Sequence, residues 1–195
     1  MFDNTEYLEL KAKYGGFSSW AIWDKLNESD TTIIDRHIES LNSNSVFLGL
    51  NVSSKLINKP WSNFHGGKHD RKIKYACNDT ELRGSYITDI FKDLDELHSE
   101  NVKLKLTPDV LINSINQFNN EMKDIKLTSN STFVIFGTPN SLIARCFNEY
   151  FKQDYRNPIV FHYHYSYYSL TDRQWVEGLW DKLNINADFN NIKSN

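Results

Sequence analysis

The chain has 195 residues, of which 39% are hydrophobic and 24% charged, so it can bury one substantial core and is too hydrophobic for wholesale disorder. A formal net charge of −3 argues against a large non-specific DNA-binding surface. The N-terminus lacks a basic and apolar secretory leader, and no apolar run reaches the roughly eighteen residues of a membrane span. Only two cysteines occur, Cys77 and Cys146, and neither has a Cys or His at metal-ligand spacing. We therefore expect a cytoplasmic protein with two reduced thiols and no membrane partner.

Helical and strand-like patterns alternate along the sequence. In chain order they predict a helix at 31–41, strands at 46–50 and 85–91, a helix at 108–123, a strand at 132–137, a helix at 139–151, a strand at 157–162 and a helix at 171–183. Thr107 is the expected N-cap of the helix that Pro108 opens. Thr171 and Gln174 have the spacing of a capping box.

This alternation predicts an α/β fold in which helices cover both faces of a sheet. We expect a three-layer α/β/α sandwich with a central, mostly parallel four-stranded sheet. Residues 1–195 are predicted to form a single domain with a core at about 31–184 and a polar tail at 185–195. The segment 3–23 has no predicted role.

Ligands of such folds bind beyond the carboxyl ends of the strands. That rule places Asn51, Asp89, the loop at Gly137 and His164 at one edge of the sheet, although they are far apart in the sequence. These residues therefore form the candidate site.

Three loop segments near this edge have both a functional and a structural interpretation. Gly49–Ser54 offers a close backbone approach and two serine hydroxyls for an anion, but strand-end turns often look the same. The loop 59–67 carries Phe64, which could stack on a planar ring or fill the core. The basic stretch Lys68–Lys74 could face a phosphate or simply be a solvated face.

The two histidines of the fourth strand allow further chemistry. His162 and His164 have the spacing of one strand face, so a metal site is conceivable with His65, His69 or Asp70 as third ligand. No spacing favours any of these, so no metal is expected. No serine lies in a Gly-flanked nucleophile elbow. A histidine at a strand end suits the stabilisation of negative charge on a leaving group.

Together these segments resemble the uracil-DNA glycosylase superfamily. Gly49–Ser54 is similar to its first motif, Gly-x-Asn-Pro-Ser/Gly, and Phe64 falls where that superfamily has a base-stacking Phe. Gly84–Lys92 is similar to the strand that supplies the base-reading side chain, and His164–Ser166 to the closing His-Pro-Ser motif. The motifs occur in the superfamily's order over roughly residues 45–182.

The resemblance implies a DNA glycosylase: a hydrolase, acting in DNA repair by base flipping, that cleaves the N-glycosidic bond of a flipped-out base without a cofactor. Its partner would be DNA, single- or double-stranded. The implied roles are catalysis for Asn51, which positions water, and His164, which stabilises the departing base; base binding for Phe64 and Asp89; phosphate binding for Ser53, Ser54 and Ser166; and a wedge for Tyr167 or Tyr168.

The sequence departs from the superfamily pattern at three positions. Val52 and Tyr165 replace the prolines of the end motifs, and Asp89 stands in place of Asn. Asn matches the N3–H and O4 of uracil, whereas an ionised Asp only accepts hydrogen bonds. Asp89 should therefore disfavour plain uracil and prefer an edge with donors, such as a cytosine amine. Alternatively, Asp89 caps a turn or pairs with Lys92 or Arg83 and never meets the base.

Two other functions are compatible with the sequence. One is a catalytically silent protein of the same fold that sequesters a nucleotide or binds DNA or a protein partner, which the net charge and the missing prolines favour. The other is an enzyme that acts on free nucleosides or nucleotides.

Overall fold

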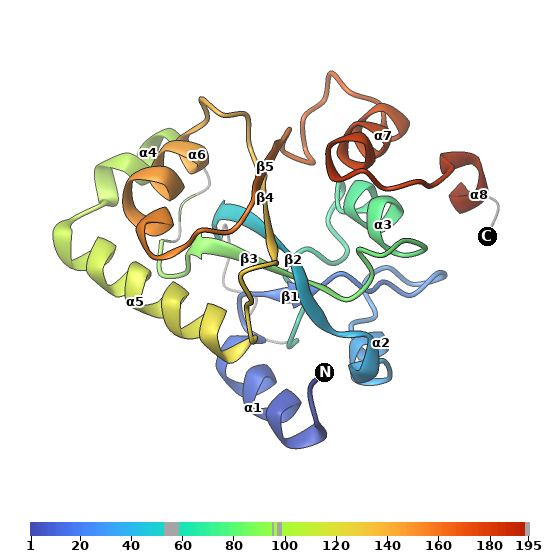
Figure 1. Ribbon diagram of the computed structural model, residues 1–195, viewed down its shortest axis with the longest axis horizontal. Helices are drawn as coiled ribbons and strands as arrows, with labels where there is room; N and C mark the ends of the chain where they lie inside the picture. The colour runs from blue at the N-terminus through green and yellow to red at the C-terminus, as the bar shows by residue number, and fades with distance from the viewer. Residues whose placement is uncertain (53–58, 95, 97–98, 194–195) are drawn as a thin grey trace.

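The computed structural model of the chain describes residues 1–52, 59–94, 96 and 99–193, whose helices and strands alternate over most of the length (Figure 1). The α-helices are α1 (Asn4–Tyr14), α2 (Thr32–Asp35), α3 (Arg71–Cys77), α4 (Ser99–Lys105), α5 (Pro108–Asp124), α6 (Leu142–Cys146), α7 (Asp172–Leu183) and α8 (Phe189–Lys193). The strands are β1 (Ser19–Trp20), β2 (Asn42–Asn51), β3 (Ser85–Phe91), β4 (Thr132–Phe136) and β5 (Ile159–His162). Shorter turns of 3-10 or π geometry are η1 (Ile38–Ser40), η2 (Phe147–Phe151) and η3 (Lys152–Asp154).

The strands form a mostly parallel sheet in the order β1-β3-β2-β4-β5. The α/β class and the parallel pairing of β2, β3, β4 and β5 are as predicted. The predicted number of four strands is wrong, because β1 adds a fifth at the edge. It pairs antiparallel with β3, Ser19 opposite Ile87 and Trp20 opposite Tyr86. A two-residue strand has no periodicity that a sequence pattern could reveal.

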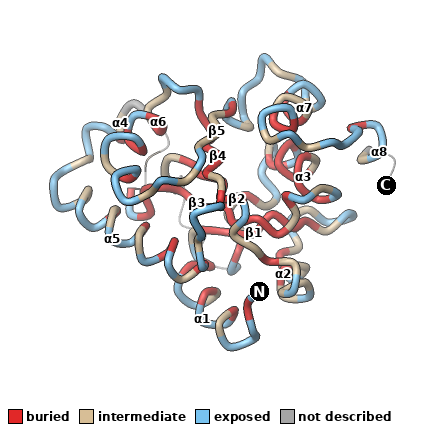
Figure 2. The backbone as a smooth tube through the Cα atoms, in the orientation of Figure 1, coloured by how far each residue is buried: buried red, intermediate tan, exposed pale blue. Residues whose placement is uncertain are grey.

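Helices lie on both faces of the sheet, an arrangement compatible with a three-layer sandwich (Figure 1). Alternate strand residues point to opposite faces. Val46, Leu48 and Phe133 pack in one core with α1 and α5, whereas Phe47 and Val134 pack in a second core with α3 and α7. β3, the middle of β2 and most of β4 are accordingly among the most deeply buried parts of the chain (Figure 2).

The hydrophobic core also includes residues ahead of position 31. Phe2, Tyr7, Leu10 and Trp20 are all buried and belong to the same core as α5. The segment 3–23, to which the sequence assigned no role, therefore supplies both a helix and the edge strand. Among the described residues no helix is both long and apolar enough to cross a bilayer.

The N-capping patterns correctly predicted where α5 and α7 begin. The Thr107 hydroxyl accepts from the amide of Val110, and Thr171 and Gln174 form a complete capping box. Two predicted helices are much shorter than expected. Within 31–41 the α-helix α2 ends at Asp35 and the 3-10 turn η1 follows, and the Thr31 hydroxyl donates to Pro60 O and does not cap α2. Within 139–151 the α-helix begins only after Ser141, its N-cap, and then widens into the π-turn η2.

Candidate functional site

A cavity of about 690 Å³ lies at the carboxyl ends of the parallel strands, where α/β folds bind ligands. Its walls come from the ends of β2, β3 and β4, from the loop after β5, from the start of α6 and from the loop ahead of α3. The described residues that line it are Gly49, Leu50, Asn51, Asn63, Phe64, Asp89, Glu96, Phe136, Gly137, Thr138, Ser141, Leu142, Ile143, Tyr163, His164, Tyr165, Ser166 and Tyr167. Asn51, Asp89 and His164 thus surround a single cavity, as the sequence predicted.

Asn51 is the last residue of β2, and its amide group is held in one orientation. Its Nδ2 donates to the carbonyl oxygens of Leu94 at 3.1 Å and Glu96 at 2.7 Å, in the segment that follows β3. Because both protons of the amide nitrogen are used in this way, its Oδ1 remains as an acceptor at the cavity wall. An acceptor at that position can orient a water molecule.

Asp89 lies beside Gly49 across the parallel pairing of β3 with β2. A Cβ atom at Gly49 would clash with the Asp89 carboxylate, so only glycine leaves room for this side chain. The carboxylate is 5% exposed, and its Oδ2 accepts a hydrogen bond of 3.0 Å from Asn63. Burial raises the pKa of Asp89 to about 6, although the Asn63 hydrogen bond and the charge of Lys92 act in the opposite direction.

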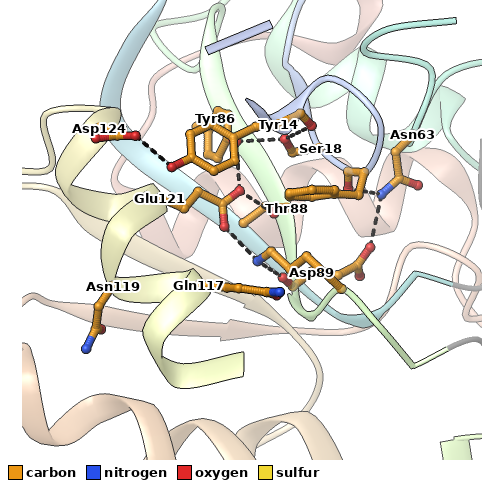
Figure 3. A network of polar contacts seen from close by, with 12 residues as sticks. Tyr14, Ser18, Asn63, Tyr86, Thr88, Asp89, Gln117, Asn119, Glu121 and Asp124 are labelled. Carbon is orange, nitrogen blue, oxygen red and sulfur yellow. Dashed lines mark hydrogen bonds and ion pairs between the residues drawn. The ribbon is translucent and has the colours of Figure 1, made fainter. Parts of the chain in front are cut away.

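The structure bears on one alternative for Asp89, the pairing of its carboxylate with Lys92 or Arg83. Lys92 forms its ion pair with Glu121, 2.7 Å away, and donates to the main-chain oxygen of Asp89. The Asp89 side chain instead meets Asn63 and the cavity (Figure 3). Pairing of the carboxylate with Lys92 or Arg83 is therefore not how this group is held.

A buried polar network lies directly behind Asp89 (Figure 3). Glu121 of α5 is 0% exposed, and its Oε1 accepts from the hydroxyls of Tyr86 and Thr88 on β3. Its other oxygen meets Lys92, which is itself buried. Since each buried charge has a partner, this network fixes the carboxyl end of β3 against α5.

His164 follows the end of β5 in a tight turn. Its Nδ1 accepts from the main-chain amide of Ser166 at 3.2 Å and lies 2.7 Å from the Ser166 hydroxyl. Desolvation, with a smaller effect from His69, lowers the pKa of His164 to about 4. The ring is therefore neutral at pH 7, and because Nδ1 accepts, the proton is on Nε2. The cavity thus contains a neutral imidazole with an N–H donor.

Aromatic side chains make the apolar part of the wall. Phe64 has a φ of 67°, an unfavourable value for a bulky residue, and its ring meets Tyr165 edge to face at 6.1 Å. Tyr165 also packs on Phe136 at 5.2 Å. Phe64 is only 6% exposed and belongs to the second core, so this ring fills the core, and it also lines the cavity. A positive φ held by the surroundings is typical of functional loops.

The other predicted contact residues have different placements. Ser166 and Tyr167 line the cavity. Ser53 and Ser54, predicted to bind phosphate, lie outside the described residues. Tyr168 is 90% exposed and lies beside a neighbouring groove instead.

The basic stretch 68–74 is largely committed to the fold. Lys72 is 4% exposed and donates to the carbonyl oxygens of Tyr167 at 2.9 Å and Leu170 at 3.0 Å. Lys74 pairs with Glu28, and Arg71 pairs with Asp172. This stretch therefore supports the loop after β5 more than it offers free charge to a phosphate.

His162 is the last residue of β5 and His164 follows that strand, and the two histidines do not act together. His162 is buried, donates from Nε2 to Trp175 O at 2.8 Å and packs on the Trp175 ring. It does not line the cavity that His164 enters. Within the described residues no group of three or more His, Cys, Asp or Glu side chains is placed to hold a metal ion.

Sequence reasoning missed Asn63, whose Nδ2 bridges Phe17 O at 2.8 Å and the Asp89 carboxylate. Its position next to Phe64 in a loop rich in turn formers was the available signal. Glu96, Thr138 and Ser141 were also missed, because single polar residues in loops carry no periodicity.

Comparison of the chain with protein-family models, with curated proteins and with solved structures found no match.

Proposed function

We propose that this chain is a divergent DNA N-glycosylase of the uracil-DNA glycosylase superfamily, built on that superfamily's three-layer sandwich. The observation that carries the proposal is the convergence of Asn51, Asp89 and His164 on one cavity beside Phe64. The cavity offers an acceptor for water, an acceptor for a base edge, an N–H donor and an aromatic wall. These are the groups that hydrolysis of an N-glycosidic bond requires.

In the proposed reaction a water molecule, held by Asn51 Oδ1, adds its oxygen to the sugar carbon while the bond to the base breaks. The bonding electrons leave with the base, which becomes an anion. His164 donates from Nε2 to the base oxygen where this charge develops. The proton lost by the water is taken up by the departing base, and neither residue changes its protonation state.

Asp89 would read the edge of the base. At pH 7 its carboxylate accepts hydrogen bonds and cannot donate, so a base with an exocyclic amine fits better than uracil. A cytosine-type base can offer its amine to Asp89 and its O2 to His164. We therefore propose a base other than plain uracil.

The experiment is base release from a panel of single- and double-stranded oligonucleotides that carry normal and modified bases. We expect release from at least one amine-bearing base, and we expect His164→Ala to lower it by about 10²–10³-fold, the effect of losing one oxyanion donor. Leu26→Ala, at an exposed residue that does not line the cavity, is the control. Absence of release across the panel, or release that His164→Ala leaves unchanged, would contradict the proposal.

A catalytically silent binding protein is the second candidate, and Tyr165 favours it. This residue replaces the proline expected after the histidine, and its ring packs on Phe64 and Phe136 within the cavity wall. A ring there narrows the space for a sugar and a base. Tight binding of a nucleotide or of DNA without base release would support this candidate.

A further inference from the structure

Three exposed tyrosines form a strip that leads away from the mouth of the cavity. Tyr163, Tyr167 and Tyr168, here called the tyrosine strip, have exposed fractions of 40%, 38% and 90%. The rings of Tyr163 and Tyr167 are stacked at 4.8 Å, and those of Tyr167 and Tyr168 lie 5.9 Å apart with a tilt of 42°. Tyr163 and Tyr167 line the cavity, whereas Tyr168 lies beside the next groove.

The backbone beneath the strip is firmly held. The amide of Tyr167 donates to His164 O, and the indole of Trp175 donates to Tyr163 O, both at 2.8 Å. Lys72 holds the loop from below through Tyr167 O. Exposed rings on such a supported loop lose little further freedom on binding, so a ligand can use their faces at low cost.

The two arginines around the strip are paired with carboxylates, whereas Lys72 and Lys182 donate to main-chain carbonyl oxygens. Lys182 lies 5.9 Å from the ring centre of Tyr163, and its ammonium donates to Phe161 O. Arg71 and Arg173 line the groove beside Tyr168, but Asp172 and Glu177 pair with them at 2.8 Å. This arrangement can accompany a single phosphate backbone, but it offers little of the free charge on which duplex binding depends.

The energetics of base flipping also favour single-stranded DNA over a duplex as the partner. Removing a base from a duplex costs a few kcal/mol of unpairing and unstacking free energy, which proteins offset with contacts to the DNA backbone. A base in a single strand is already unpaired, so much less has to be offset. With a net charge of −3 and both arginines near the strip paired with carboxylates, this chain has few free cations with which to offset that cost. Aromatic faces, in contrast, stack on any unpaired base.

We infer that the tyrosine strip binds single-stranded DNA, with bases that neighbour the one in the cavity stacked on its rings. The placement of a base in the cavity rests on the proposed function, whereas the binding of the strand to the strip does not. The site therefore selects an unpaired strand through stacking, in addition to selecting a base.

The test measures fluorescence anisotropy of a short labelled oligonucleotide of normal bases, alone and paired with its complement, on the full chain. We expect the single strand to bind on the order of tenfold tighter than the duplex. Because both arginines near the strip are paired with carboxylates, few phosphates are neutralised and the dependence of binding on salt should be weak. Tyr168→Ala should weaken single-strand binding about fivefold, the low end for one stacked base. Tyr168→Phe retains an aromatic face and should bind like the wild type, as should Leu26→Ala.

Several results would overturn the inference. One is equal or tighter binding of the duplex, and another is no effect of Tyr168→Ala on strand binding. A third is that Tyr168→Ala changes the oligomeric state of the chain and leaves strand binding as it was, which would make the strip a contact between copies of the chain. A measurement of base release distinguishes failure of the single-strand inference from failure of the proposed glycosylase function. Tyrosine-dependent strand binding without any base release would leave the inference standing and remove the glycosylase. Base release from duplexes that is indifferent to Tyr168 would do the reverse.

Discussion

Asp89 carries a stability cost that its place in the cavity explains. The carboxyl is enclosed between Gly49, Asn63 and the cavity, and its pKa is raised to about 6. The folded chain therefore holds a proton at pH 4–6 that the unfolded chain has released, so stability falls as the pH rises through this window. At pH 7 the buried carboxylate costs about 2–3 kcal/mol, at 1.36 kcal/mol for each pKa unit.

Asp89→Asn should therefore stabilise the protein at pH 7 by about 2 kcal/mol and have almost no effect below about pH 4. The amide that replaces the carboxylate would keep an acceptor for Asn63 and remove the buried charge. Urea unfolding at the two pH values measures the difference. Equal effects at both pH values would show that the carboxylate is not protonated on folding.

The same variant changes the edge offered to a base. An amide presents one donor and one acceptor, which suits uracil, whereas the carboxylate presents acceptors alone. Stabilisation of the folded chain by free deoxycytidine and deoxyuridine, followed as a shift of Tm, should reverse in order between wild type and Asp89→Asn. An unchanged order would place the base edge elsewhere in the cavity.

At the scale of elements, α3 supports the loop that follows β5. Lys72 extends from α3, and its buried ammonium donates to two carbonyl oxygens of that loop. Lys72→Met keeps most of the volume but leaves both carbonyls without this donor. It should destabilise the chain by about 1–3 kcal/mol and weaken single-strand binding, although Lys72 is not part of the strip.

Lys68→Met is the matched control, because Lys68 is exposed in the same basic stretch and should affect neither stability nor binding. Urea unfolding and the anisotropy assay read out the two effects. If both variants weaken binding equally and neither affects stability, Lys72 acts as a surface charge and not as a support for the loop.

The elements also show what the sequence could predict. Capping residues determined the starts of α5 and α7 because their hydrogen bonds are local. The helix predicted at 139–151 is largely replaced by a short α6 and a π-turn, in which Phe147 packs on Phe133 of β4, a contact between distant residues that no local pattern predicts. Convergence of the β2, β3 and β5 ends followed from the parallel topology, whereas the Asn63–Asp89 contact depends on a loop in which Trp61, Phe64 and Gly66 have positive φ.

Across the whole molecule, desolvated neutral histidines predict sensitivity to acid. Desolvation lowers the pKa of both His65 and His162 to about 4. His162 donates to Trp175 O, and the ring of His65 stacks on Trp23 at 4.8 Å. The unfolded chain binds protons on these rings from about pH 6.5 downward and the folded chain does not, so stability is lost as the pH falls from about 6.5 to 4.

Each of these two rings contributes up to about 3 kcal/mol to that loss, and His164 contributes less because its ring is exposed to the cavity. Asp89 opposes the loss, since its folded form takes up a proton between pH 6 and 4. The fall of the unfolding free energy over this range should therefore be steeper in Asp89→Asn than in wild type. In His162→Gln the fall of the unfolding free energy with decreasing pH should be shallower by the equivalent of about one proton. The loss of stability that this substitution causes should be largest at pH 7. Denaturant unfolding at intervals between pH 7 and 4 measures all three slopes, and identical slopes would contradict the burial of these groups as neutral species.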